Sequence, residues 1–222
     1  MSLTSFYTLA NLFSQHGFNL WLVGGSSRDY LLGLPLADLD LTTDAKPSEM
    51  KLFIPNANFR FAHYGTVQLQ QGQQHIDITT LRQEAVYQDK RHPDAITFIK
   101  DPRLDFPRRD LTINALYITS TLQVLDYVKG QDDLKAKVLR MIGEPYARLQ
   151  EDPLRILRVL RFQHRLGFTL EPTLAKALVD SLSLLDYLNP AKVNQELKKM
   201  MQDRPDEAAL LLASYGIDPG QR

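Results

Sequence analysis

The sequence predicts an α+β fold over roughly the first 140 residues, followed by an all-helical part. In the first part, short apolar runs typical of strands are mixed with stretches of helical periodicity. From Glu144 onward nearly every stretch has a period near 3.6 and a leucine-rich face. We therefore predict one domain at 1–142 and a helical domain at 143–222. A chain of 222 residues with 44% hydrophobic content is long enough for two real cores.

The first elements can be read from the spacing of apolar residues. Residues 3–16 have helical spacing and end at Gly17, which predicts a helix. The apolar run at 20–23 predicts a buried strand, and residues 26–32 predict a short helix. A further strand is expected at 38–41.

Later elements follow the same rules. Strand-like runs are 58–62, 66–70, 75–80, 115–119 and 123–125, the last two forming a hairpin. The highly charged stretch 82–94 is predicted to be a mobile loop. In the helical part, a proline in the first turn predicts four successive helices, at Pro153, Pro172, Pro190 and Pro205.

Composition limits the classes of function. The 26 basic and 26 acidic residues balance, so RNA would have to be held by local patches rather than by a general field. One such patch contains six arginines: Arg140, Arg148, Arg155, Arg158, Arg161 and Arg165. The chain has no cysteine, no signal peptide and no apolar run near the roughly 20 residues of a membrane span. We expect a soluble cytoplasmic protein without membrane contact.

A glycine-rich turn between the strand at 20–23 and the next helix is the first candidate site. Gly24 and Gly25 lack a Cβ, so a ligand can approach the backbone closely. A phosphate there would meet the unpaired amides of a helix start, and Arg28 adds a permanent cation. The plain alternative is an ordinary strand-to-helix turn.

Two aspartates follow this turn. In a strand at 38–41, Asp38 and Asp40 point to one face and Leu39 and Leu41 to the other. Two carboxylates on one face repel each other unless a cation lies between them, and magnesium held jointly with phosphates suits such ligands. The alternative is a solvated strand end. The ordered succession of glycines, arginine and aspartates favours metal-assisted nucleotidyl transfer.

Two further groups remain open between a functional and a structural interpretation. Asp77 lies in the middle of a predicted strand, and its side chain is on the other face of the strand from the two neighbouring isoleucines. It is either a third acid beside the metal or part of an exposed polar face. The segment 108–114 carries Arg108, Arg109, Asp110 and Asn114. These side chains would face a triphosphate or ribose, or form a surface ion-pair cluster.

The segment 151–161 is the second strong signal. Acids in a first helical turn are ordinary capping devices, but Asp152 and Arg155 are also neighbours at helical spacing, and Arg158 and Arg161 follow slowly around the axis. A carboxylate acceptor beside a guanidinium donor matches the Watson–Crick edges of cytosine and adenine and opposes those of uracil and guanine. A wrong base would cost about 1–3 kcal/mol.

With these residues in hand, the chain resembles the class II tRNA nucleotidyltransferases, that is, bacterial CCA-adding enzymes and their poly(A) polymerase relatives in the DNA polymerase beta-type superfamily. The family pattern Leu-Val-Gly-Gly-x-x-Arg-Asp-x-Leu-Leu-Gly, then Asp-x-Asp, matches 22–40. Arg-Arg-Asp-x-Thr-x-Asn-Ala matches 108–115, and Glu-Asp-x-x-Arg-x-x-Arg-x-x-Arg-Phe matches 151–162. The charged loop also agrees, at Tyr87, Asp89, Arg91 and Pro93.

The resemblance implies a polymerase-beta-type head, with a mixed sheet flanked by helices, and a helical neck. Asp38 and Asp40 would bind two magnesium ions, with Asp77 as the extra catalytic carboxylate. Nucleotide-binding residues would be Gly24, Gly25, Ser26, Arg28, Arg109, Asp110, Asn114, Asp152, Arg155, Arg158 and Arg161. The implied reaction adds C and A from CTP and ATP to the tRNA 3′ end by in-line attack of the 3′-hydroxyl with release of pyrophosphate.

Departures from the family pattern leave alternatives. Ser26 and Ser27 stand where the family commonly has Ala-Val, and their hydroxyls would either reach phosphate or cap the helix. Lys129 replaces a glycine of the family's linker. Because the chain stops at 222 residues, we expect the body and tail domains of the family to be absent. A poly(A) polymerase, a CC- or A-adding enzyme, and a non-catalytic nucleotide- or RNA-binding module remain alternatives. The loop 84–93 favours C addition, and oligomeric state is not predicted.

Overall fold

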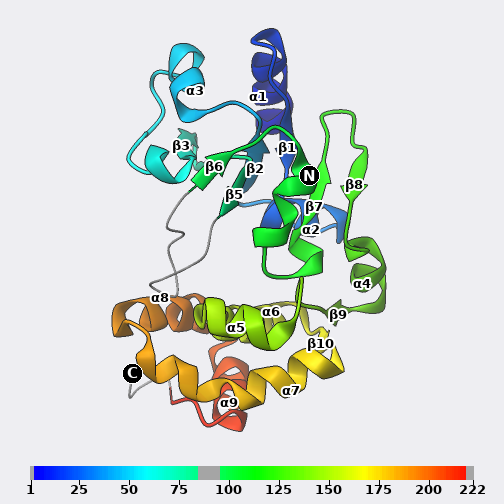
Figure 1. The fold of residues 1–222 in the computed structure, drawn as a ribbon, viewed down its shortest axis with the longest axis vertical. Helices are drawn as coiled ribbons and strands as arrows, with labels where there is room; N and C mark the ends of the chain where they lie inside the picture. Colours follow the sequence, from blue (N-terminus) through cyan, green and yellow to red (C-terminus); the bar gives the residue numbers. More distant parts are fainter. Residues whose placement is uncertain (1–2, 85–95, 219–222) are drawn as a thin grey trace. The chain divides into compact units, whose positions relative to one another are not determined.

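The computed structural model describes residues 3–84 and 96–218. These residues form two compact units, an N-terminal unit that ends at Leu134 and a C-terminal unit that begins at Lys135. Strands and helices are mixed in the first unit, whereas helices dominate the second (Figure 1). The predicted fold class is confirmed. The predicted domain boundary after residue 142 stays a prediction.

A six-stranded mixed sheet forms the centre of the N-terminal unit. Its strands β2 and β4 are parallel, and the other neighbours are antiparallel. The strand order is β3 (Thr66–Gln71), β4 (Gln74–Thr80), β2 (Leu39–Thr43), β1 (Leu20–Leu22), β7 (Leu116–Ile118) and β8 (Val124–Asp126). The predicted strands at 20–23, 38–41, 66–70 and 75–80 and the hairpin at 115–125 are therefore confirmed, within a few residues at their ends.

The two faces of this sheet differ in chemistry. Helices α1 (Thr4–Gln15) and α3 (Pro47–Phe53) pack on one face, where Phe6 and Met50 join Leu39, Leu41 and neighbouring strand residues in the main core. On the other face lies a smaller cluster around Trp21, Val23 and Tyr117. Because side chains alternate along a strand, the polar residues of β2 and β4 fall on this second face.

Helix α2 (Gly24–Leu31) starts two residues earlier than predicted, so both glycines belong to its first turn. Gly24 has φ +63°, a left-handed conformation that glycine adopts without strain, and Val23 before it is extended. The chain therefore passes from β1 into the helix without a separate loop.

One prediction for the middle of the chain, a strand at 58–62, was wrong. Residues 58–62 make only an isolated bridge from Asn58 to Gln68, because the Asn58 side chain accepts a hydrogen bond from the Arg60 amide and turns the chain. Short 3₁₀ helices fill much of the remaining chain: η1 (Ala62–Tyr64), η2 (Pro102–Leu104), η3 (Phe106–Arg108) and η4 (Thr112–Asn114).

The predicted loop at 82–94 is in part a strand. Residues Arg82–Glu84 form β5 and pair with β6 (Ile96–Phe98). The rest of the predicted loop, with Tyr87, Asp89, Arg91 and Pro93, lies outside the described residues.

A tight turn leads into α4 (Gly130–Ala136). The Asp126 carboxylate accepts hydrogen bonds from the Val128, Gly130 and Gln131 amides, each at 3.0 Å, and so caps the start of this helix. A Cβ on Gly130 would lie 2.4 Å from the Thr112 carbonyl oxygen, which explains the glycine. Lys129 has φ +60°, which explains why a glycine is common at that position in the resembling family.

The C-terminal unit contains helices α5 (Pro145–Glu151), α6 (Leu154–Leu166), α7 (Pro172–Asp180), α8 (Pro190–Met201) and α9 (Pro205–Ser214) and the 3₁₀ helix η5 (Leu182–Tyr187). The prolines at the starts of α7, α8 and α9 confirm the prediction, and Pro153 lies directly before α6. A short parallel pair, β9 (Val138–Leu139) with β10 (Thr169–Leu170), was not predicted. Among the described helices, none is long and apolar enough to cross a membrane.

Candidate active site

Three acidic residues of the N-terminal unit, Asp38, Asp40 and Asp77, lie close together on the strands β2 and β4 or directly before them. Asp40 on β2 is the register partner of Asp77 on β4, so the two acids are neighbours across a parallel strand pair. Asp38 directly precedes β2, and its carboxylate accepts a hydrogen bond from the His75 amide at 3.3 Å. The sequence analysis left open whether Asp77 joins the other two acids, and the register places it next to Asp40.

Asp77 is held by one side chain from the neighbouring strand β3 and one from its own strand β4. Its Oδ1 accepts a hydrogen bond from Gln68 Nε2 at 2.9 Å and lies 3.0 Å from His75 Nε2. These contacts fix the carboxylate beside Asp40 without burying it, because the Asp77 side chain remains 38% exposed. A ligand can therefore reach it from solvent.

The glycine turn and Asp40 are in direct contact. The Gly25 amide donates a hydrogen bond to Asp40 Oδ2 at 3.0 Å, and a Cβ on Gly25 would lie 3.0 Å from the same oxygen. The Ser26 hydroxyl accepts a hydrogen bond from the Asp40 amide at 2.7 Å and donates one to the Asp38 carbonyl at 3.3 Å. The start of α2 and the acidic strand thus form one rigid corner.

The serines at the start of α2 serve the backbone in this structure. Ser26 is buried and bridges to β2, while the Ser27 hydroxyl donates to the Gly24 carbonyl at 3.2 Å. Neither hydroxyl caps the start of the helix, which was one of the two roles considered for them. A phosphate contact for Ser26 stays a prediction.

The electrostatics of this corner favour a bound cation. Neighbouring protein atoms desolvate the Asp40 carboxylate and thereby raise its pKa, and the charge of Asp77 raises it further. The Gly25 amide, Arg109 and Arg28 act in the opposite direction. A divalent cation beside the two carboxylates would compensate this unfavourable negative charge.

Arg28 lies beneath the corner rather than on its surface. Its side chain is only 1% exposed and donates to Asp29 at 2.7 and 2.8 Å and to Asn114 Oδ1 at 2.7 Å. Asn114 Nδ2 donates in turn to Asp110 Oδ1 at 3.2 Å. Three predicted nucleotide-binding residues, Arg28, Asp110 and Asn114, therefore form one buried network that joins α2 to η4.

Arg108 and Arg109 form an ion-pair cluster around the buried Asp105, and their own side chains are 15% and 12% exposed. Both guanidinium groups donate to Asp105, at 2.8 Å from Arg108 Nε and 2.9 Å from Arg109 Nη2. The Tyr117 hydroxyl donates to the same Asp105 carboxylate at 2.7 Å and accepts from Arg109 Nε at 3.0 Å. The surface ion-pair alternative is thus wrong about exposure and right about pairing, and nucleotide contact by Arg109 stays a prediction.

The predicted base-reading residues lie in the C-terminal unit. Asp152 lies between α5 and α6, where its Oδ1 accepts a hydrogen bond from the Leu154 amide at 3.1 Å, so neither Glu151 nor Asp152 belongs to the first turn of α6. Arg155 is buried and donates to Glu151 at 2.5 Å and to the Arg148 carbonyl at 2.7 Å. Glu151 is therefore a direct partner of Arg155, in addition to Asp152, which the sequence predicted to act with Arg155.

The later arginines of α6 face α8 and their own helix. Arg161 donates to Glu196 at 2.9 Å, and its guanidinium lies 4.5 Å from the centre of the Phe162 ring. Arg158 lies 6.0 Å from the same ring. These contacts give Arg161 a structural role, and contact of either arginine with phosphate stays a prediction.

Sequence reasoning missed Asp105, Tyr117 and Glu196. Asp105 lies three and four residues before the two arginines that it pairs with, a spacing that would have indicated the contact if a helical turn had been predicted there. Tyr117 was interpreted only as part of a strand. Glu196 is nearly fully buried, which no local pattern indicated.

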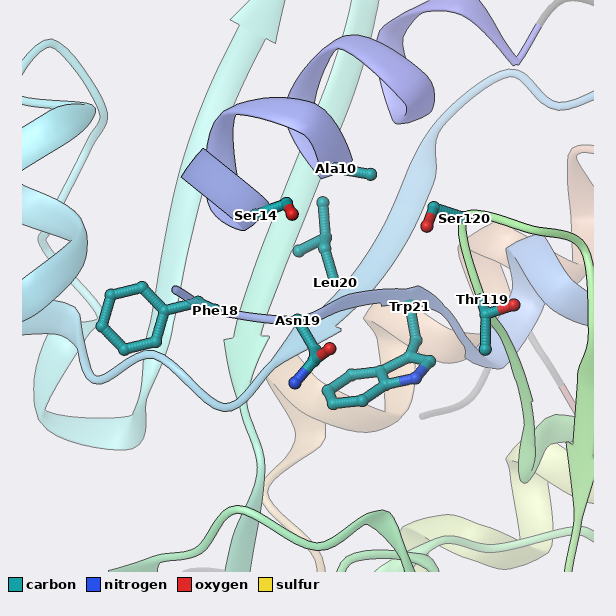
Figure 2. A pocket seen from close by; sticks show the side chains of 8 residues that line it. All are labelled: Ala10, Ser14, Phe18, Asn19, Leu20, Trp21, Thr119 and Ser120. Atoms are coloured by element: carbon teal, nitrogen blue, oxygen red, sulfur yellow. The ribbon is translucent and has the colours of Figure 1, made fainter. Parts of the chain in front are cut away.

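A separate hollow of about 100 Å³ lies at the start of β1, at the opposite end of that strand from Gly24. Figure 2 shows the eight side chains that line it: Ala10, Ser14, Phe18, Asn19, Leu20, Trp21, Thr119 and Ser120. Its volume is well below the roughly 300 Å³ of small ligand pockets. We therefore do not include it in the candidate site.

Comparison with known proteins identifies the family of this chain. Residues 20–140 match the family model described as the poly A polymerase head domain. The CCA-adding enzyme of Bacillus subtilis strain 168 is 37% identical over 87% of this chain and 49% of the relative. That of Staphylococcus saprophyticus is 37% identical over 83% of this chain and 46% of the relative. The chain thus spans about half the length of the curated relatives it matches.

Solved structures give the same result. The Bacillus stearothermophilus CCA-adding enzyme in complex with CTP has a TM-score of 0.86 and 28% identity, covering 98% of this chain and 54% of that one. A tRNA nucleotidyltransferase complexed with a primer tRNA and an incoming ATP analogue has a TM-score of 0.77 and 30% identity, covering 94% and 60%.

Fold and comparisons together define a chain homologous to nucleotidyltransferases of the CCA-adding type. More particularly, it belongs to the family of class II CCA-adding enzymes and poly(A) polymerases that share the poly A polymerase head domain.

Proposed function

We propose that this chain is a template-independent RNA nucleotidyltransferase. It adds C and A nucleotides from CTP and ATP to the 3′ end of tRNA and releases pyrophosphate. The relatives named as CCA-adding enzymes, and the related structures that hold CTP, an ATP analogue and tRNA, support this proposal.

The hydrogen bond from the Gly25 amide to Asp40 carries the proposal. It ties a helix start, where backbone amides meet phosphate oxygens, to a carboxylate that has a second acid as its strand neighbour. A nucleoside triphosphate bound at this helix start would have its phosphates beside the acids. An ordinary strand-to-helix turn would not require the close approach of Gly24 and Gly25 to a carboxylate.

The acids fit magnesium bound together with a nucleotide. No group of three His, Cys, Asp or Glu side chains within residues 3–84 and 96–218 converges tightly enough to hold a metal by itself. Magnesium usually takes only one or two carboxylates and completes its shell with phosphate oxygens and water. Asp38 and Asp40, with Asp77 beside them, meet that requirement, and bound magnesium would supply positive charge to the reacting phosphate and hydroxyl oxygens.

The remaining residues of the N-terminal unit bind and orient the nucleotide. The amides at the start of α2 would hold phosphate oxygens, and Arg109 would add a cation on the same side as Asp40, whose pKa it lowers. The buried bonds of Arg28 to Asn114 would stiffen the helix start that carries these amides. No side chain needs to act as a nucleophile, because the RNA 3′-hydroxyl attacks the α-phosphate directly.

Base selection belongs to the C-terminal unit in this proposal. Asp152 and Arg155 would accept the Watson–Crick edges of C and A, and the bonds of Arg155 to Glu151 and to the Arg148 carbonyl would orient its guanidinium. Arg158 and Arg161 would support this helix. A fixed donor and acceptor pair discriminates well, because a wrong base leaves buried polar groups unpaired.

A poly(A) polymerase is the second candidate, since the matching family model bears that description. The deciding experiment supplies each nucleotide singly, with magnesium, to tRNAs that end before C, after one C and after CC, and to an oligo(A) primer. Our proposal predicts C on the first two tRNAs and A on the third. Long extension of oligo(A) by ATP alone would favour the second candidate, and nucleotide binding without pyrophosphate release would indicate a non-catalytic module.

A further inference from the structure

We propose that Asp105 is a positioning residue that, together with the Tyr117 hydroxyl, holds the guanidinium of Arg109 in its nucleotide-binding orientation. This inference rests on the proposed function, in which Arg109 contacts the nucleotide. It assigns a role to two residues outside the three motifs that carry the family resemblance at the glycine turn, at 108–115 and at 151–162.

The carboxylate of Asp105 is the centre of a buried polar network. The residue is fully buried, and its two oxygens accept hydrogen bonds from Arg108 Nε, Arg109 Nη2, Tyr117 Oη and the Arg82 amide at 2.7 to 3.0 Å. A buried carboxylate with this many donors is fixed in one orientation. The arginine side chains that donate to this carboxylate are therefore fixed as well.

Arg109 is held on two sides. Its Nη2 and Nε donate to Asp105 Oδ2 at 2.9 and 3.1 Å, and its Nε also donates to Tyr117 Oη at 3.0 Å. The guanidinium lies 5.1 Å from the centre of the Tyr117 ring, a stacking arrangement that favours arginine over lysine. An arginine fixed before the ligand arrives loses less conformational entropy on binding than a free one.

Burial and the neighbouring charges together set the protonation states of Asp105 and Tyr117. Although burial favours the neutral acid, Arg108 and Arg109 lower the pKa of Asp105 well below its usual range, so the carboxylate stays charged. Burial raises the pKa of Tyr117, so its hydroxyl keeps the proton that it donates to Asp105. The network has the same hydrogen-bonding pattern across the physiological pH range.

The network reaches the acidic corner through Arg109. The charge of Arg109 is one of those that lower the pKa of Asp40, so the arginine lies within electrostatic range of the proposed catalytic carboxylates. Arg109 thus links the buried Asp105 network to the acidic corner.

A double-mutant cycle between Tyr117 and Arg109 tests this inference. Tyr117→Phe removes one hydroxyl and keeps the ring, so we expect KM for CTP and the Kd for CTP with magnesium to rise about 5- to 10-fold, with kcat within about 2-fold of wild type. In the Arg109→Ala background, Tyr117→Phe should raise neither the KM nor the Kd for CTP any further. Asp105→Asn should act in the same direction and more strongly, and the conclusion holds on Tyr117→Phe alone if Asp105→Asn does not fold.

Tyr127→Phe is the matched control, since its ring centre lies 6.2 Å from that of Tyr117, while the charges that act on its hydroxyl are those of Asp101 and Arg103. It should behave as wild type. Equal effects of Tyr117→Phe with and without Arg109 would overturn the inference while leaving the proposed function intact, as would an unchanged KM and Kd. A wild-type chain that neither binds CTP nor incorporates it would overturn the proposed function itself, and the inference with it.

Discussion

Asp40 and Asp77 are register partners on the parallel strands β2 and β4, and the charge of Asp77 contributes to raising the pKa of Asp40. The negative charge of Asp77 disfavours ionisation of Asp40 when no cation is present. The arrangement costs stability in the metal-free protein, and such costs are typical of sites that bind a charged ligand.

Replacing Asp77 should therefore separate stability from metal response. We expect Asp77→Asn to raise the thermal midpoint of the metal-free protein at neutral pH, because it removes the like charge beside Asp40. The same change should reduce the further rise that magnesium with CTP produces in wild type. Thermal unfolding in EDTA and in magnesium with CTP measures both effects, and an undiminished response to magnesium would argue against Asp77 as a member of the site.

The close approach of Gly25 to Asp40 predicts a variant that folds but loses activity. A Cβ on Gly25 would lie 3.0 Å from Asp40 Oδ2, so Gly25→Ala must displace the carboxylate by a few tenths of an ångström. We expect nucleotide incorporation to fall about 10-fold or more, because reacting groups tolerate little misplacement. The unfolding free energy should change little, because the roughly 1 kcal/mol by which alanine favours the helix over glycine offsets the cost of displacing the carboxylate.

Gly17→Ala is the matched control for that variant. Gly17 has φ +80° and open space around its Cα, so alanine there strains the backbone without touching the site. It should lose about 1 kcal/mol of stability and keep its activity. Wild-type activity in Gly25→Ala would show that this contact does not matter for the reaction.

The C-terminal unit should lose stability at acidic pH through Glu196. Burial favours the neutral acid, but the charges of Arg161 and Lys199, both bonded to Glu196 at 2.9 Å, lower its pKa. A lowered pKa means that the ion pairs stabilise the fold fully above the ordinary value of 4.5 and less as the pH falls below it. Glu196→Gln should therefore cost about 1–3 kcal/mol at neutral pH, and less at acidic pH.

Urea unfolding of wild type and Glu196→Gln between pH 3 and pH 7 (roughly the window over which a lowered carboxyl titrates) measures this dependence. Glu207→Gln is the control, because its ion pair with Arg204 at 2.7 Å is exposed and worth at most about 1 kcal/mol. A constant difference between Glu196→Gln and wild type at all these pH values would contradict the assigned titration.

Discrimination among bases should depend on the guanidinium of Arg155. Lysine keeps the charge but cannot donate from a planar fork to Glu151, to the Arg148 carbonyl and to a base at once. We expect Arg155→Lys to lower the preference for CTP over UTP by about 10-fold, in line with the loss of one base-specific contact. The exposed Arg165→Lys is the control, and an unchanged preference in Arg155→Lys would remove Arg155 from base selection.

Most of the fold could be predicted from the sequence where the periodicity was strong. The core strands and the proline-started helices follow directly from apolar spacing and capping. The missed elements are short and depend on tertiary contacts: α3 was not predicted, residues 58–62 turn at Asn58, and β5 pairs with a strand from beyond the charged loop. Such pairing has no local signal, because hydrogen bonds to a distant segment decide it.

The candidate site was predictable as a set of residues but not as a set of contacts. The alternation of Asp38 and Asp40 gave their common face, and the parallel pairing with β4 then placed Asp77 beside Asp40. The burial of Arg28 and the pairing of Arg109 with Asp105 could not be predicted, because both depend on partners from other elements. The sequence identifies an arginine as a cation, whereas its neighbours decide which way it points.

The central claim is that Asp40 acts with the glycine-lined helix start on a magnesium-bound nucleotide. Its most direct test is the magnesium-dependent release of pyrophosphate from CTP by Asp40→Asn, with a tRNA lacking its terminal CCA as acceptor. Asp132→Asn, an exposed acid on α4, is the control. We predict wild-type rates for Asp132→Asn and a loss of about 10³-fold or more for Asp40→Asn with its fold unchanged. A folded Asp40→Asn protein that releases pyrophosphate at the wild-type rate would contradict the account.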